Sequence, residues 1–249
     1  MIYPFILTLL AGLCTMIGTL PIFVNFKNEN KLIASACSFA AGVMIALSIL
    51  DLVPASISYL KISNNYLHVI LFAFIFIILG IMVATFLDSL VDKVSHGNNL
   101  FNVGILSMLV IILHNIPEGI ITYVVSNKNI LLGISLCIAI ALHNIPEGIS
   151  IAVPLYYATN SKNKAILYTL VSALSEFLGA IITYLFLDHF ISNNMLGYIL
   201  SFTAGIMLAI SIQKLLPTGN YYNHKLTRIF FIIGFIFMVI SLQLNSLIS

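Results

Sequence analysis

Two stretches of the sequence share six residues: ILHNIPEGII runs from Ile112 to Ile121, and ALHNIPEGIS runs from Ala141 to Ser150. Each HNIPEG copy lies inside an apolar run, where a buried imidazole or carboxylate is costly unless it has a partner. Residues i and i+4 of a helix lie on one face, so each copy aligns its histidine with its glutamate. The two copies therefore predict two apolar helices that present the same polar groups.

The composition places these helices in a membrane. Of 249 residues, 61% are hydrophobic and only 7% are charged, whereas a soluble domain carries roughly 25% charged residues. We expect an all-α membrane protein in which residues 1–249 form a single polytopic transmembrane domain. The net charge of +2 is too small to indicate a nucleic-acid partner. The three cysteines have no CxxC spacing, so neither a disulfide nor a thiolate metal site is expected.

The apolar segments predict eight transmembrane helices, because each reaches the roughly 20 residues that cross a bilayer. They are approximately Ile2–Asn25, Leu32–Ile57, Leu67–Leu90, Phe101–Val125, Ile130–Leu155, Ala165–Leu187, Met195–Leu216 and Ile229–Leu247.

Lysine and arginine in the loops predict the orientation, since cytoplasmic loops carry an excess of both. With the N-terminus outside, the outer loops hold only Lys61 and Lys128. The inner side then holds Lys27, Lys31, Lys93, Lys162, Lys164, Lys214, Lys225 and Arg228. Both termini are therefore expected outside a cell membrane, and the compact Ile/Asn/Lys-rich chain hints at a bacterial one.

A repeat is present outside the HNIPEG segments. SFAAGVMIALSILDLVP (Ser38–Pro54) and SFTAGIMLAISIQKLLP (Ser201–Pro217) are identical at ten of 17 positions, at an offset of 163. A weaker match relates Leu7–Gly18 to Tyr168–Gly179. Helices 1–3 and 6–8 are thus expected to form an inverted repeat around helices 4–5, a 3+2+3 arrangement typical of transporters with a binding site near the midplane.

The polar groups of HNIPEG indicate a metal site. Imidazole and carboxylate without thiolate suit Zn²⁺, Fe²⁺, Mn²⁺ or Cd²⁺, whereas Mg²⁺ and Ca²⁺ prefer oxygen ligands alone. The glycine that follows each glutamate lets another helix or an ion come close. The alternatives are that each His–Glu pair is a satisfied buried hydrogen bond or a proton relay. The candidate ligands of the two motifs are His114, Asn115, Glu118, His143, Asn144 and Glu147.

Other polar residues add candidates with more open roles. Glu176 lies in mid-span and is expected to be a ligand, because an intramembrane carboxylate is a functional candidate by default. Asp51 either guides cations at an outer vestibule or simply reaches the interface. Met44 matches Met207 in the repeat and is either a packing residue or a thioether contact. His224 is either a solvated loop residue or a contact for a departing ion.

These motifs resemble those of the ZIP (Zrt/Irt-like) family of divalent metal transporters, in particular its small bacterial members. Besides the two HNIPEG copies, the resemblance rests on LTLLAGLCTMIG, FAAGVMIALSILDLVPA and SALSEFLGA. It implies transport of zinc, or of iron, manganese or cadmium, into the cytoplasm through a two-metal site. The first position would use His114, Glu118, His143 and Glu147, and the second Asn115, Asn144, Glu118, Glu147 and Glu176, with Glu118 and Glu147 bridging.

The chain departs from the family pattern at two places. Phe177 stands where relatives often have proline. Gln213 and Lys214 stand where similar sequences tend to be acidic, so Lys214 is expected to repel a divalent ion on the inner exit route unless its side chain extends to the interface.

Two other classes of function remain as alternatives. An intramembrane zinc hydrolase would need HExxH, but Asn115 and Asn144 occupy the place of the catalytic glutamate, so no enzyme is expected. A metal receptor would need an output module, and the short loops contain none. No cofactor is expected besides the transported ion, the expected partners are the metal and the lipid bilayer, and a homodimer is left open.

Overall fold

The computed structural model describes residues 2–24, 27–62, 65–94, 99–187 and 191–248, so Asn25, the expected end of the first span, lies outside the described residues. All secondary-structure elements in the described part of the chain are helices, and it contains no strand. The elements are α1 (Tyr3–Leu13), η1 (Cys14–Phe23), α2 (Glu29–Leu47), η2 (Ser48–Leu52), α3 (Val53–Lys61), α4 (Tyr66–Val94), α5 (Asn99–Lys128), α6 (Ile130–Thr159), α7 (Lys162–Ile182), η3 (Thr183–Leu187), α8 (Asn193–Ile210), η4 (Ser211–Leu215) and α9 (Leu216–Ile248).

Seven segments of the described residues are long and apolar enough to cross a membrane. The last of them, Asn193–Leu244, has 52 residues, which as one helix would be about 78 Å long against a hydrocarbon core of roughly 30 Å. This segment is broken at Asn223, whose backbone is extended at φ −166° and ψ 101°. The Asn223 side chain accepts a hydrogen bond from the Leu226 amide at 3.0 Å and so caps a new helix.

Polar residues of the short linkers cap α2 and α6 in the same way. Asn28 caps α2 through the Lys31 amide at 3.1 Å, and Asn129, between α5 and α6, caps α6 through the Leu131 amide at 2.9 Å. Asn160 adopts the left-handed conformation at φ 49°, which asparagine tolerates, and reverses the chain between α6 and α7. The turns between α5 and α6 and between α6 and α7 have only one and two residues, which keeps these consecutive helices side by side.

The sequence repeat has the same local geometry in both copies. The π-helical turns η2 and η4 begin at Ser48 and Ser211, which are 163 positions apart. Each turn precedes a proline, Pro54 or Pro217, at the matching position. A π-helical turn inside an α-helix is rare and is frequent at functional sites.

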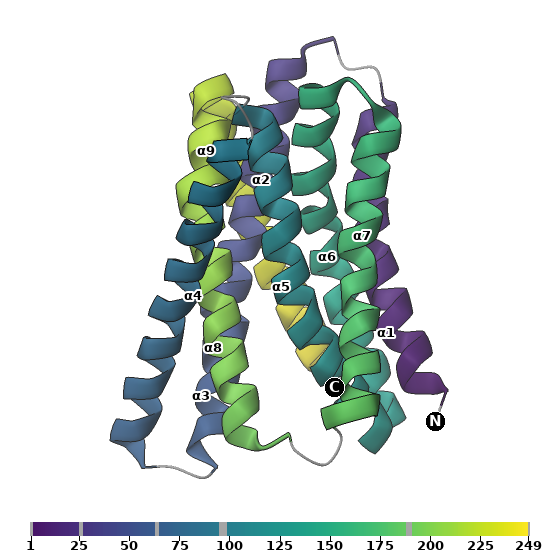
Figure 1. Cartoon of the computed structure of the whole chain (residues 1–249), viewed down its shortest axis with the longest axis vertical. Coiled ribbons are helices and arrows are strands. Elements are labelled where there is room, and N and C mark those ends of the chain that lie inside the picture. The colour runs from purple at the N-terminus through teal and green to yellow at the C-terminus, as the bar shows by residue number, and fades with distance from the viewer. Residues whose placement is uncertain (1, 25–26, 63–64, 95–98, 188–190, 249) are drawn as a thin grey trace.

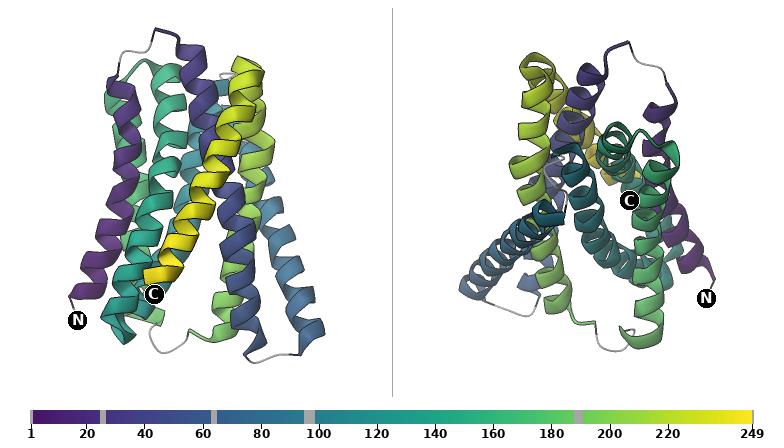
Figure 2. Two further views of the ribbon diagram at one scale, coloured as in Figure 1. Left: turned by 180° about the vertical axis from the view of Figure 1, so that it is seen from behind. Right: turned by 45° about the horizontal axis from the view of Figure 1, so that its top comes forward.

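The helices form two groups that meet along the centre of the bundle. α1, η1, α5, α6 and α7 pack on one another, whereas α2 packs on α9, and α4 and α3 pack on α8. Figure 1 and Figure 2 place both chain ends at the same end of the bundle, together with the turn between α5 and α6. The turn between α6 and α7 lies at the opposite end. Large apolar side chains such as Leu67 and Phe74 of α4 are exposed on the outside, as a lipid environment requires.

Candidate metal centre

The two HNIPEG segments meet in the interior, where α5 and α6 pack against each other and against α7. Their prolines, Pro117 and Pro146, lie inside continuous helices. All seven predicted ligands are buried, with 6% or less of each residue exposed: His114, Asn115, Glu118, His143, Asn144, Glu147 and Glu176.

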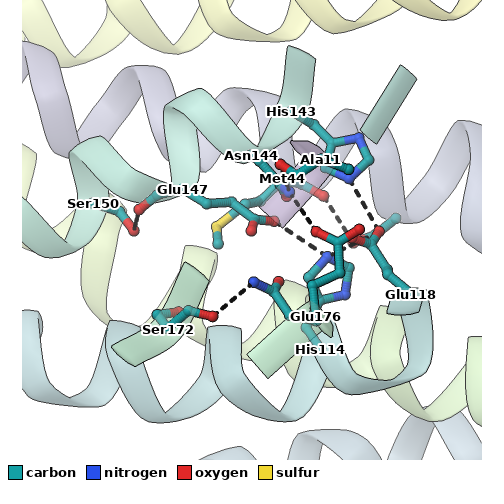
Figure 3. A network of polar contacts seen from close by, with 12 residues as sticks. Ala11, Met44, His114, Glu118, His143, Asn144, Glu147, Ser150, Ser172 and Glu176 are labelled. Atoms are coloured by element: carbon teal, nitrogen blue, oxygen red, sulfur yellow. Dashed lines mark hydrogen bonds and ion pairs between the residues drawn. The ribbon is translucent and has the colours of Figure 1, made fainter. Parts of the chain in front are cut away.

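Glu118 links the two histidines. Its Oε1 atom lies 3.2 Å from Nε2 of His114 and 3.0 Å from Nε2 of His143. His114 Nε2 is also 3.2 Å from Oε1 of Glu147. Figure 3 shows these side chains converging on one another from the two helices. Ligand-type atoms of His114, Glu118 and His143 lie within 4.8 Å of one another, close enough to share one metal ion.

The asparagines connect this cluster to α7 and α1. The Asn144 amide donates to Oε2 of Glu176 at 2.9 Å and to the backbone oxygen of Ala11 at 3.0 Å. The Asn115 amide donates to the backbone oxygen of Ser172 at 3.2 Å. Because a backbone carbonyl accepts from the amide nitrogen of each asparagine, the amide oxygen of each points elsewhere. The carbonyls of Ala11 and Ser172 were not among the sequence candidates, because a backbone oxygen leaves no residue-type signal.

Five buried oxygen atoms of the cluster have neither a hydrogen bond nor an ion pair in the described part of the chain, whereas Oε1 of Glu147 has only its ion pair with His114. The five atoms are Oδ1 of Asn115, Oε2 of Glu118, Oδ1 of Asn144, Oε2 of Glu147 and Oε1 of Glu176. An unpaired buried acceptor costs about 1–3 kcal/mol, and more if it is charged. Five such atoms in one place therefore favour a cation-binding site over a self-satisfied hydrogen-bond network.

Glycines next to the two glutamates permit the close packing that forms the site. A Cβ atom on Gly119 would overlap the backbone oxygen of Glu176 in α7, and one on Gly148 would overlap that of Thr15 in η1. In both cases the obstacle is backbone, which a side-chain rotation cannot relieve. The sequence expectation that these glycines allow the close approach of another helix is confirmed.

One cavity, of about 310 Å³, reaches the cluster from the end of the bundle that holds both termini. Glu118 and His143 line its inner part, and Tyr59, Val125 and Leu132, near the ends of α3, α5 and α6, line its outer part. Asp51 also lines it. Met44 is fully buried and appears in the close-up of the cluster, whereas His224 is exposed and pairs with Asn220 at 3.3 Å.

A second cavity, of about 490 Å³, lies beside η4 and the start of α5. Lys214 lines it and forms an ion pair with Asp88 of α4, with Nζ 2.6 Å from Oδ1, while Oδ2 of Asp92 is 3.8 Å away. The charge of Lys214, which the sequence analysis expected to repel a divalent ion on the inner route, is thus neutralised by Asp88 of α4.

Replacing Lys214 by methionine should destabilise the protein by about 1–2 kcal/mol, because Asp88 would keep its partly buried charge without its partner. The double variant Asp88→Asn/Lys214→Met should recover part of that loss. Thermal unfolding midpoints in detergent measure both effects. A double variant whose loss of stability equals or exceeds the sum of the losses in the two single variants would contradict the pairing.

Membrane helices that share buried imidazoles and carboxylates define an ion-handling membrane protein. Comparison with known proteins narrows this class: a profile of the family described as ZIP zinc transporter matches residues 94–242. A protein of Clostridium perfringens named zinc transporter ZupT is 37% identical over an alignment of 275 positions, which covers 96% of this chain and 95% of that protein. The chain belongs to the ZIP family.

Proteins with the same name give similar values. The Streptococcus mutans protein is 37% identical, covering 96% of both chains, and the Enterobacter sp. protein is 38% identical, covering 87% of this chain and 86% of its own. The chain is therefore a multi-pass membrane protein that transports divalent metal, similar to bacterial ZupT proteins, and the hydrolase alternative is wrong.

Proposed function

We propose that the protein imports zinc into the cytoplasm through a two-metal site built from both HNIPEG segments and Glu176. The observation that carries the proposal is the set of five unpartnered buried oxygens beside two imidazoles that share Glu118. Three carboxylates enclosed by helices need cationic partners, and the described side chains in contact with them include no lysine or arginine.

Two metal positions account for the donor atoms. The first uses His114, Glu118, His143 and Glu147, a nitrogen and oxygen set that suits tetrahedral zinc. The second uses the free oxygens of Asn115, Asn144 and Glu176 together with Glu118 and Glu147, which bridge the two ions. Zinc is favoured because the relatives are named zinc transporters, and iron, manganese and cadmium are the competing ions for such ligands.

The proposed direction of transport rests on the distribution of lysine and arginine among the loops and on the cavity of about 310 Å³, here called the outer cavity. The break at Asn223 in the seventh apolar segment supports eight transmembrane helices in the 3+2+3 order. The excess of lysine and arginine in the other loops supports the placement of both termini outside. The cavity that reaches Glu118 and His143 starts from the end with the termini. Metal then enters from outside. A single transport domain and a homodimer both stay predictions.

Uptake by purified protein tests the proposed function. Proteoliposomes should accumulate zinc at a rate well above that of protein-free vesicles, and iron, manganese or cadmium in excess should compete according to their affinity for the site. Failure of the wild-type protein to accumulate any divalent metal would contradict the proposal.

Single cysteines test the topology in a background that lacks Cys14, Cys37 and Cys137. With both termini outside, Lys128→Cys should react with a membrane-impermeant maleimide in intact cells, and Lys162→Cys only after permeabilisation. Labelling of both from the same side would contradict the eight-span arrangement. Labelling of Lys162→Cys alone in intact cells would show that the orientation is the opposite of the proposed one.

A further inference from the structure

We propose that the carboxylate of Asp51 captures the incoming divalent metal in the outer cavity and passes it on to Glu118 and His143. This inference rests on the proposed import function and adds a third metal position to it. The position differs from the two in the cluster because it holds the ion only during its approach.

The first support is the place of Asp51 in the cavity. Asp51 lies in η2, seven residues beyond Met44, which corresponds to about 10 Å further toward the outer end of the same helix. Its side chain lines the cavity whose inner part is formed by Glu118 and His143. Most other residues around this space are apolar, among them Leu47, Ile121, Leu136 and Ile140. An ion that moves through this cavity meets Asp51 as the only carboxylate of the described lining besides Glu118.

The second support is that the carboxylates of Asp51 and Glu118 both have oxygen atoms that are free to contact a cation. No hydrogen bond or ion pair joins Asp51 to another described residue. Oε2 of Glu118, at the inner part of the cavity, is buried and also without a hydrogen-bond partner among the described residues. Asp51 is exposed and lines the cavity, so an incoming cation can contact its carboxylate without displacing another side chain.

The third support comes from the repeat. Lys214 is the counterpart of Asp51 at the offset of 163, in the equivalent π-helical turn, and lines the second cavity. Lys214 is held by Asp88 at 2.6 Å, whereas Asp51 has no such partner. Two related positions thus carry opposite charges at two cavities. The unpaired acid lies on the side from which the cation arrives, where a local charge raises the association rate by about 10-fold or more.

Uptake kinetics of Asp51→Asn test the inference. Initial zinc uptake by proteoliposomes, measured against external zinc concentration, should give a KM about tenfold above that of the wild type. The maximal rate should stay within about twofold, because the cluster itself is intact. Asp51→Glu should restore the wild-type KM, and Asp51→Ser should match Asp51→Asn.

Glu29→Gln is the matched control, since it removes one negative charge from the exposed beginning of α2, at the opposite end of the same helix rod. Its KM should equal that of the wild type. An unchanged KM in Asp51→Asn, or a fall in maximal rate that Asp51→Glu does not rescue, would overturn the capture role. Absence of uptake by the wild type would instead overturn the proposed function, so the two failures are distinct.

Discussion

Replacing Glu118 by alanine is expected to lower zinc uptake by more than about 100-fold, beyond the 10–100-fold loss typical when only an outer partner of a metal ligand is removed. Glu118 is the shared residue of the cluster, because Oε1 contacts both histidines at 3.2 and 3.0 Å and Oε2 is free for a second ion. The variant would lose a ligand of both metal positions at once. Radioactive zinc uptake at saturating concentration measures the loss.

His143 provides the comparison within the site. Its Nε2 atom lies 3.0 Å from Oε1 of Glu118, and His143 belongs to one proposed metal position. His143→Ala should therefore keep more uptake than Glu118→Ala. His224→Ala, which removes an exposed histidine outside the cluster, should behave as the wild type. Normal uptake by Glu118→Ala would show that the two ions are not bridged by this residue.

The sequence predicted the main features of the fold because they depend on composition and spacing. Low charge indicates a membrane bundle, and the i, i+4 spacing in HNIPEG aligns His114 with Glu118 and His143 with Glu147. The 17-residue repeat also predicts related structure, and its two copies contain π-helical turns at equivalent positions. In each of these cases the signal is carried by side chains within a short segment.

Contacts between segments that are distant in sequence could not be predicted from composition and spacing. The cross-helix contact of His143 with Glu118 depends on the rotation and height of α5 relative to α6, which no single helix determines. The pairing of Lys214 with Asp88 likewise joins two helices that are far apart in sequence. The last helix begins at Asn223 and not near Ile229, because a capping side chain decides its start while hydropathy responds only to the apolar residues that follow.

Alanine at Gly148 is expected to remove the metal site even though it changes no ligand. The added Cβ would overlap the backbone oxygen of Thr15, so α6 must move away from η1, and Glu147 is the adjacent residue. Overpacking of this kind costs about 1–3 kcal/mol. The displacement should also separate Glu147 from His114, whose contact distance is 3.2 Å.

Thermal unfolding in detergent with and without zinc separates these two effects. A ligand that binds the folded protein alone raises its stability according to its concentration and affinity. Gly80→Ala is the matched control, because its Cβ would overlap the backbone oxygen of Phe202 where α4 packs on α8, away from the cluster. Both variants should unfold at lower temperature than the wild type. Zinc should still stabilise Gly80→Ala, whereas Gly148→Ala should lose most of that stabilisation. An equal zinc response in the two variants would mean that the site does not depend on the close contact between α6 and η1.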